Sequence, residues 1–228
     1  MLKRLASGAS AFSTFFQVVP KLAAVIRRMR PTWHLPSLSA VDAEFLRTNG
    51  IRGLIWDVDG TLTGDRRPAL EPEAAPAFRA LMGFDWLKHV VLSNSSEERF
   101  RELGAIFPEL TILRAYEVDG SVVYRKRRGA GDSMSDAEVQ ALLERGGRMI
   151  RKPSRALVEY ALRELALGAG EAAMIGDQYM TDVAGANFGG VRSIKLPTIA
   201  PETFRLSVKL SQRLEKLIYA FFYGRKRS

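Results

Sequence analysis

The stretch IRGLIWDVDGT, residues 51–61, decides the fold that this sequence predicts. Its first half, residues 51–56, is a short and mainly apolar run of the kind that forms a strand buried on both faces. Asp57 and Asp59 follow this run directly, together with Gly60 and Thr61. In open parallel sheets, polar residues at the carboxyl ends of strands form the functional site. Because Asp-x-Asp-Gly alone is often only a turn, the rest of the chain must show whether such a site exists.

Four more apolar runs follow, each short enough to be a strand. They cover residues 90–92, 111–113, 172–175 and 191–196. Helical segments are expected around them, at about residues 72–82, 96–106, 154–166 and 179–188. Two of these helices have start signals, because Ser95 and Glu98 are spaced as a capping box and Ser154 follows a proline. The alternation predicts the α/β class, a three-layer Rossmann-like parallel sheet with helices on both faces.

A small insertion and a helical lead are expected in addition to this core. Residues 50–200 form the core, and residues 115–150 within it read as a hairpin that turns at Asp119-Gly120, followed by a short helix capped by Ser135. Residues 1–49 form a basic, partly apolar lead, which we expect to be helical.

Two features of the lead bear on membranes. Pro20 is expected to kink or divide its helix, which has Phe12 and Phe16 on one face. The longest uncharged stretch, residues 5–20, is too short and too polar for a transmembrane helix.

The composition excludes several kinds of chemistry. The chain has no cysteine, which rules out disulfides, thiolate nucleophiles and cysteine-ligated zinc and fits a reducing compartment such as the cytoplasm. The two histidines, His34 and His89, lie far apart in the sequence, so a histidine metal cluster is not expected. Catalysis, if present, therefore depends on carboxylates, hydroxyls and lysine.

The net charge of +9 is concentrated at the two ends. Residues 1–41 contain six basic residues and no acid, whereas residues 203–228 contain seven basic residues and one acid, Glu215. Residues 201–228 read as a basic amphipathic helix, with Leu210 and Leu214 on its apolar stripe. Such a helix either binds an anionic membrane surface or packs its stripe on the core. We expect a cytoplasmic protein, peripheral on the inner face of the membrane, and no nucleic-acid partner, since no nucleic-acid module is recognisable.

Four short elements in order resemble the motifs of the haloacid dehalogenase-like superfamily of aspartate-nucleophile phosphatases. They are Asp57-Val58-Asp59-Gly60-Thr61, Ser93-Asn94-Ser95, Lys152-Pro153 and the run from Gly176-Asp177 to Thr181-Asp182. Each follows a predicted strand or opens a predicted helix. Singly, each has an ordinary structural interpretation as a turn, a helix cap or a solvated charge. Together they favour catalysis.

The resemblance implies a role for each of these residues. Asp57 would attack phosphorus, and Asp59 would act as acid and then as base. Ser93 and the amide of Asn94 would hold the phosphoryl group, with Thr61 positioning the loop. Lys152 would neutralise the phosphoryl charge. The resemblance further implies an Mg²⁺ ion, held by Asp57, the backbone carbonyl of Asp59, and Asp177, with Asp182 supporting Lys152 or a metal-bound water.

Within the superfamily, the basic apolar lead and Lys152-Pro153 resemble the phosphatidylglycerophosphate phosphatase-like group. That resemblance implies a lipid phosphate as the substrate. Two departures are Gly60, where the group more often has Asn, and the insertion at residues 115–150. The alternative is a soluble phosphatase of a sugar phosphate or nucleotide, and a nucleic-acid-associated or non-catalytic binding protein is a weaker one. The sequence leaves the exact substrate, the oligomeric state and the role of the insertion open.

Overall fold

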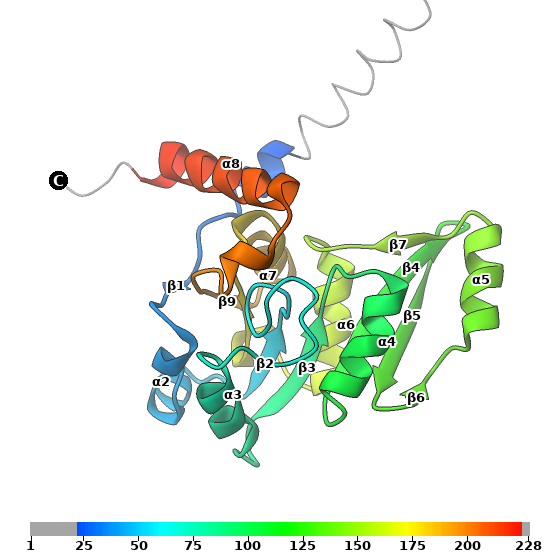
Figure 1. The fold of residues 1–228 in the computed structure, drawn as a ribbon, viewed down its shortest axis with the longest axis horizontal. Coiled ribbons are helices and arrows are strands. Elements are labelled where there is room, and N and C mark those ends of the chain that lie inside the picture. Colours follow the sequence, from blue (N-terminus) through cyan, green and yellow to red (C-terminus); the bar gives the residue numbers. More distant parts are fainter. Residues whose placement is uncertain (1–21, 225–228) are drawn as a thin grey trace, which may run out of the picture.

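Nine strands form one mixed sheet in the computed structural model, which describes residues 22–224 (Figure 1). The strand order is β1-β9-β8-β2-β3-β4-β5-β6, and β7 pairs with β4 outside this path. The strands are β1 (Trp33–His34), β2 (Gly53–Trp56), β3 (Lys88–Leu92), β4 (Thr111–Val118), β5 (Ser121–Arg128), β6 (Gly131–Asp132), β7 (Arg148–Ile150), β8 (Ala172–Gly176) and β9 (Arg192–Lys195). From β1 to β4 all neighbours are parallel, whereas β5, β6 and β7 pair antiparallel.

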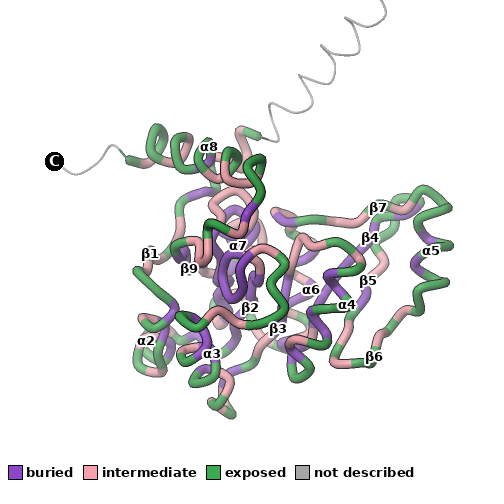
Figure 2. The backbone as a smooth tube through the Cα atoms, in the orientation of Figure 1, coloured by how far each residue is buried: buried purple, intermediate pink, exposed green. Residues whose placement is uncertain are grey.

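Helices cover both faces of the parallel part, as the sequence predicts. They are α2 (Ala43–Thr48), α3 (Ala75–Met82), α4 (Glu97–Ile106), α5 (Asp136–Glu144), α6 (Arg155–Leu165), α7 (Ala184–Gly189) and α8 (Leu206–Tyr223). Successive side chains of a strand point to opposite faces. Leu54 and Trp56 of β2 accordingly pack in one buried cluster with α2, α3 and α4, whereas Ile55 packs in a second cluster with α6 and α7. The three-layer α/β fold is therefore confirmed, and its two cores enclose the central strands (Figure 2).

The structure corrects three local predictions about helices. Ser96, one residue after the predicted Ser95, caps α4 by accepting a hydrogen bond from the backbone N–H of Arg99. Ser154 precedes α6, but its side chain makes no capping hydrogen bond. The single helix expected at 179–188 is instead a π-helical turn, Tyr179–Val183, followed by α7. Each error lies at a helix end, where local sequence signals compete with tertiary contacts.

The segment 115–150 forms a lateral extension of the sheet. β4 continues past Leu113 to Val118, turns at Asp119-Gly120 and returns as β5, and α5 begins with the expected capping box of Ser135 and Glu138. Val139 and Leu142 of α5 pack in a small separate cluster with strand residues of the extension. In Figure 1 this part lies to one side of the parallel strands.

Three of the four consecutive bases at residues 125–128 are held in ion pairs. Arg125 is fully buried and pairs with Asp132 and Glu97, whereas Lys126 pairs with Glu164 and Arg127 with Asp132. Most of the charge of this run therefore binds the extension to itself and to the helices that carry Glu97 and Glu164, and is not available to an anionic substrate.

The N-terminal part enters the core earlier than the expected boundary at residue 50. β1 pairs with β9 at the sheet edge, and Leu38, Val41 and Leu46 are buried in the larger cluster. Of the predicted lead helix, residues 22–26 are helical, whereas Phe12, Phe16 and Pro20 lie outside the described residues. Within residues 22–224, no helix is both long and apolar enough to span a membrane.

Candidate active site

The register of the central strands gathers the motif residues at one edge of the sheet. Trp56, the last residue of β2, is paired with Val91 of β3 on one side and with Ile175 of β8 on the other. The residues that follow these strands therefore emerge side by side. Asp57, Ser93 and Asp177 are the side chains placed there, and this is the edge that the sequence predicted.

A tight loop after β2 fixes the direction of the Asp57 carboxylate. The backbone N–H groups of Thr61, Leu62 and Thr63 all donate to the carbonyl of Val58. This folding brings the Thr61 hydroxyl 3.0 Å from Asp57 Oδ2, to which it donates a hydrogen bond. Thr61 thus positions the nucleophile candidate and is itself fully enclosed.

Lys152 reaches the same place from the start of α6. Its buried ammonium donates to Asp57 Oδ1 at 2.6 Å and to Asp182 Oδ1 at 2.7 Å. The other oxygen of Asp182 accepts from the backbone N–H of Gln178 at 3.0 Å, so this carboxylate closes the π-helical turn and holds Lys152. Of the two roles considered for Asp182, the contacts match support of Lys152.

Asn94 is placed to orient Lys152 through the backbone. Its side-chain carbonyl accepts from the Lys152 N–H at 2.7 Å, and its amide donates to the Lys152 carbonyl at 3.1 Å. These two bonds join the loop after β3 to the segment before α6. Ser93 lines the pocket together with Asn94.

Asp177 follows β8 and has one oxygen without a partner. Its Oδ2 accepts from Thr198 Oγ1 at 2.7 Å and from Gln212 Nε2 at 3.2 Å. Its Oδ1 is buried and has no hydrogen-bond partner among the described residues. Buried polar atoms are nearly always paired, so this oxygen is available to a ligand that the chain does not supply.

The donor set suits a hard divalent cation. One carboxylate oxygen from each of Asp57, Asp177 and Asp182 lies within 4.8 Å of the others. All-oxygen ligands with an open side for water or phosphate are what Mg²⁺ prefers. The Asp59 carboxylate is not part of this group. The resemblance had implied that Asp59 would bind the metal through its backbone carbonyl alone. The residues present thus fit the implied Mg²⁺, and Asp177 is the one of the three with an oxygen that no described residue engages.

The balance of buried charge favours the same cation. Four buried carboxylates, on Asp57, Asp177, Asp182 and Glu215, face two buried ammonium groups, on Lys152 and Lys195. If all were ionised, the cluster would carry two uncompensated negative charges, which is expensive in a buried site. A divalent cation supplies the missing charge.

Burial dominates the pKa values of these groups. It raises the pKa of Asp57 to about 8, against the opposing effect of Lys152, and neighbouring Asp182 and Asp177 raise it further. Burial also raises the pKa of Asp177 to about 7, with Asp182 adding to the effect. For Lys152, burial lowers the pKa, but the charges of Asp182 and Asp57 outweigh it and raise the pKa above its ordinary value. The ammonium is therefore charged at neutral pH.

The Asp59 side chain faces a different partner, Arg99 of α4. Arg99 Nη2 donates to Asp59 Oδ1 at 2.8 Å and also to the carbonyl of Arg67 at 2.8 Å. The Arg99 side chain is 1% exposed, so a buried cation fixes the predicted acid and base. Sequence reasoning missed Arg99, because a basic residue on an amphipathic helix usually reads as solvated.

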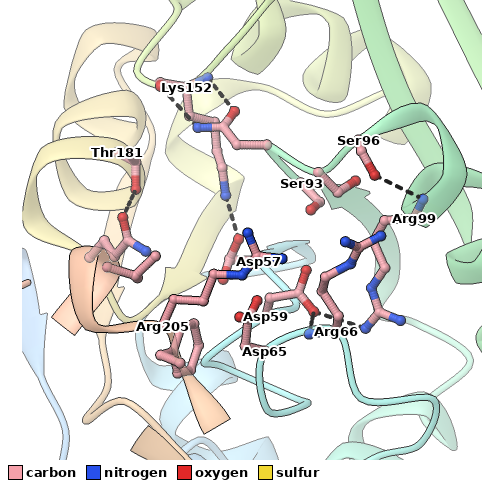
Figure 3. A pocket seen from close by; sticks show the side chains of 15 residues that line it. Asp57, Asp59, Asp65, Arg66, Ser93, Ser96, Arg99, Lys152, Thr181 and Arg205 are labelled. Carbon is pink, nitrogen blue, oxygen red and sulfur yellow. Dashed lines mark hydrogen bonds and ion pairs between the residues drawn. The ribbon is translucent and has the colours of Figure 1, made fainter. Parts of the chain in front are cut away.

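A pocket of about 320 Å³ opens over these groups (Figure 3). Its lining includes Asp57, Asp59 and Lys152 together with three serines, Ser93, Ser95 and Ser96. The lining also includes Phe204, Arg205 and Val208, where α8 begins, and a further basic residue, Arg66. Arg66 and Arg205 belong to none of the four motifs, so the sequence alone did not indicate that they line the pocket.

Comparison with known proteins bears on the later half of this site. Residues 149–198 match a family model described as HAD-hydrolase-like, where HAD stands for haloacid dehalogenase. The matched stretch contains Lys152, Asp177 and Asp182, the third and fourth elements of the site. No curated protein matches the sequence.

Two solved structures show partial likeness to the chain. An uncharacterised protein from Listeria monocytogenes serotype 4b has 20% identity and a TM-score of 0.42, and the alignment covers 67% of this chain and 88% of that one. A structure from Bacillus subtilis described as a candidate p-nitrophenyl phosphatase has 14% identity and a TM-score of 0.20, over 69% of this chain and 59% of that one. Scores this low do not bear on chemistry.

The fold, the four-part site and the family match agree on one class. They agree with a likeness to haloacid dehalogenase-like hydrolases, which the family model gives for residues 149–198. The finer assignment to the phosphatidylglycerophosphate phosphatase-like group is not part of this agreement.

Proposed function

We propose that the protein is an Mg²⁺-dependent phosphomonoester hydrolase that works through a phosphorylated Asp57. One observation carries the proposal: Lys152 joins Asp57 to Asp182, and Asp177, which has one oxygen without a partner among the described residues, lies in the same carboxylate group. A nucleophilic carboxylate, a fixed ammonium and an oxygen-rich cation site are the parts that phosphoryl transfer requires.

The residues divide the reaction into two displacements. A carboxylate oxygen of Asp57 attacks phosphorus, the bond to the ester oxygen breaks, and Asp59 gives its proton to that leaving oxygen. A water then attacks the phosphorylated Asp57, Asp59 takes the proton of the water, and inorganic phosphate leaves with Asp57 restored. Lys152 offsets the repulsion between the carboxylate and the phosphate, about 4 kcal/mol for unit charges 4 Å apart at an effective dielectric of 20. When bound, Mg²⁺ supplies further positive charge to the phosphoryl oxygens.

We propose a membrane lipid phosphate, such as phosphatidylglycerophosphate, as the substrate. No residue of the segment 115–150 lines the pocket, so this extension does not close it over a small molecule. The wall is instead formed by Phe204, Arg205 and Val208 at the start of the basic helix α8. An open pocket beside such a helix suits a phosphate that stays attached to a cytoplasmic membrane surface.

A release assay for inorganic phosphate tests the proposal. The full chain with Mg²⁺ is compared on vesicles that contain a lipid phosphomonoester and on sugar phosphates and nucleotides in solution. Release from lipid but not from soluble monoesters supports the proposal, and the reverse supports a soluble sugar-phosphate or nucleotide phosphatase. Asp57→Asn serves as the control, and full activity of this variant would reject Asp57 as the nucleophile.

A further inference from the structure

Helix α8 has its apolar side turned away from the protein. Leu206, Leu210, Leu214, Leu217 and Phe221 are between 57% and 84% exposed, whereas the acidic Glu215 is 5% exposed. A surface helix of a soluble protein normally does the opposite, with its apolar stripe on the core. The packing of this stripe on the core, which the sequence had left open, does not occur in the structure.

The exposed residues form a continuous stripe. At about 100° per residue, the five side chains fall within about 80° of the helix circumference, and Glu215 lies roughly opposite. In Figure 1, α8 lies across one end of the body, next to the short helical segment of residues 22–26. The outward stripe, defined as Leu206, Leu210, Leu214, Leu217 and Phe221, is therefore a single apolar surface that no described residue covers.

Specific contacts hold α8 in this orientation. Glu215 Oε1 accepts from the backbone N–H of Met180 at 2.7 Å, and the ring of Tyr219 stacks on Tyr179 with centroids 4.0 Å apart. Near the end of the helix, the Tyr223 hydroxyl donates to the carbonyl of Ile26 at 2.7 Å. Because buried polar and aromatic groups fix the inner side, turning the helix over would break all of these contacts.

The charge around the outward stripe distinguishes between possible occupants. Arg213 and Lys216 are exposed along one side of it, and Arg205 is exposed at its start. Glu215, the only acid in α8, is buried. A second copy of this chain would bring like charges together along the stripe, whereas a surface of anionic lipids attracts them, by about 1 kcal/mol per base.

We infer that the outward stripe of α8 is a docking surface for an anionic lipid bilayer, which holds the pocket mouth against that bilayer. The helix begins at the pocket wall formed by Phe204, Arg205 and Val208, so the stripe and the pocket mouth are adjacent. The apolar side chains enter the acyl boundary, as in other interfacial helices, and the basic side chains meet the head groups. As far as it concerns the substrate, this inference rests on the proposed function.

Vesicle sedimentation with the full chain tests the docking surface. The vesicles contain about three parts phosphatidylcholine to one part phosphatidylglycerol, and pure phosphatidylcholine serves as the uncharged comparison. Leu210→Gln combined with Leu217→Gln removes two side chains from the middle of the stripe. Val122→Gln combined with Leu143→Gln is the matched control, because those residues are 39% and 38% exposed on the lateral extension.

The expected result is a loss of binding confined to the stripe variant. Each leucine that becomes buried in the bilayer contributes about ten-fold to the affinity for vesicles. The stripe variant lacks two of them and should therefore bind anionic vesicles about a hundred-fold more weakly. The control variant should bind anionic vesicles as the wild type does. Both variants should hydrolyse a lipid phosphomonoester dispersed in detergent at the wild-type rate, because the stripe takes no part in the chemistry. Lipid phosphate hydrolysis on vesicles should fall in parallel with binding.

Two outcomes would overturn the inference. One is unchanged vesicle binding by the stripe variant. The other is a wild-type dimer in light scattering that the same substitutions dissociate, since the stripe would then be an interface between two copies. A wild-type protein that binds vesicles through the stripe but hydrolyses no phosphomonoester would refute the proposed function and leave the docking surface standing.

Discussion

Lys152 Nζ lies 2.6 Å from Asp57 Oδ1, although the two residues are 95 positions apart in the chain. Both side chains are almost completely enclosed, at 2% and 11% exposure. The contact joins the end of β2 to the start of α6 and thereby links the first and third motifs. An ion pair in this position affects stability as well as chemistry.

Replacing Lys152 with Met should reduce both the stability of the fold and the phosphatase activity. Removal of one partner of a buried ion pair typically costs about 3–5 kcal/mol, because a charge is left without compensation. Here Asp57 and Asp182 would both lose their partner. Urea unfolding at pH 8 should show this loss together with loss of phosphatase activity. Lys126→Met breaks the half-exposed pair with Glu164 and should cost at most about 1 kcal/mol. Equal losses in the two variants would contradict the assigned importance of Lys152.

The stability of the metal-free protein should fall as the pH rises from about 4 to about 8. Burial raises the pKa of Asp57 to about 8 and that of Asp177 to about 7. The unfolded chain releases these protons near pH 4, so the folded protein binds more protons between the two limits. Stability decreases with pH wherever the folded state holds more protons. Thermal unfolding in a chelator from pH 5 to pH 8.5 checks the slope.

Added Mg²⁺ should reverse this trend. Metal binding requires ionised ligands and releases their protons, so it competes with protonation at low pH. The increase in Tm on adding Mg²⁺ should therefore be larger at pH 8 than at pH 6. Asp177→Asn should reduce both the pH slope and the response to Mg²⁺. A Tm that does not change with pH in the chelator would show that the carboxyls of Asp57 and Asp177 are not held in the neutral form in the folded protein.

The sequence predicted the parallel core and the place of the motif residues, because both follow from short-range patterns. An apolar run that ends in Asp57 or Asp177 specifies a strand end, and parallel strand ends share one edge. The contacts that complete the site come from distant segments. Thr198 and Gln212 both reach Asp177, yet neither is part of a recognisable motif.

Helix α8 illustrates a different limit. The spacing of its leucines predicts an amphipathic helix, and this helix is present. The same spacing does not say which side of the helix faces the protein. That depends on distant groups: the backbone N–H of Met180, which donates to Glu215, and the ring of Tyr179, which stacks on Tyr219. Only the folded structure shows that the polar side is the inner one.

Arg99 should matter for turnover through its hold on Asp59. Arg99→Met removes the hydrogen bond of 2.8 Å to Asp59 Oδ1. General acid–base catalysis contributes about 10²–10⁴-fold, so a misdirected Asp59 should reduce kcat by about ten- to a hundred-fold, with a smaller effect on KM. Arg101→Met on the same helix removes only an exposed pair with Asp136 and should leave kcat unchanged. An undiminished kcat in Arg99→Met would show that Asp59 needs no such support.

Gly60 should resist substitution because of both its backbone and its neighbour. Its φ of +96° is unfavourable for other residues, and an added Cβ would lie 2.8 Å from Asp177 Oδ2. Gly60→Ala should therefore cost about 1–3 kcal/mol and weaken the response of Tm to Mg²⁺. Gly120→Ala is a matched control, since its φ is +74° and no atom lies within 4 Å of the added Cβ. It should lose stability but keep the response to Mg²⁺, so a normal response in Gly60→Ala would separate Gly60 from the metal site.

Glu215 should limit stability at high pH, because the inner side of α8 buries it. Burial raises its pKa to about 7, whereas the unfolded chain ionises near 4.3. The ionised carboxylate therefore disfavours the folded state above about pH 7. Glu215→Gln keeps an acceptor for the Met180 N–H and carries no charge, so its Tm should exceed that of the wild type at pH 8.5 and equal it at pH 4.

Glu215→Leu provides the contrast that separates charge from hydrogen bonding. This variant leaves the Met180 N–H without its acceptor, which should cost about 1–3 kcal/mol at low pH, where the charge plays no part. Both variants are best compared with the wild type in a chelator, by thermal unfolding from pH 4 to pH 8.5. If Glu215→Gln were less stable than the wild type at pH 8.5, the ionised carboxylate would instead stabilise the inner side of α8, through Lys195 or Lys216.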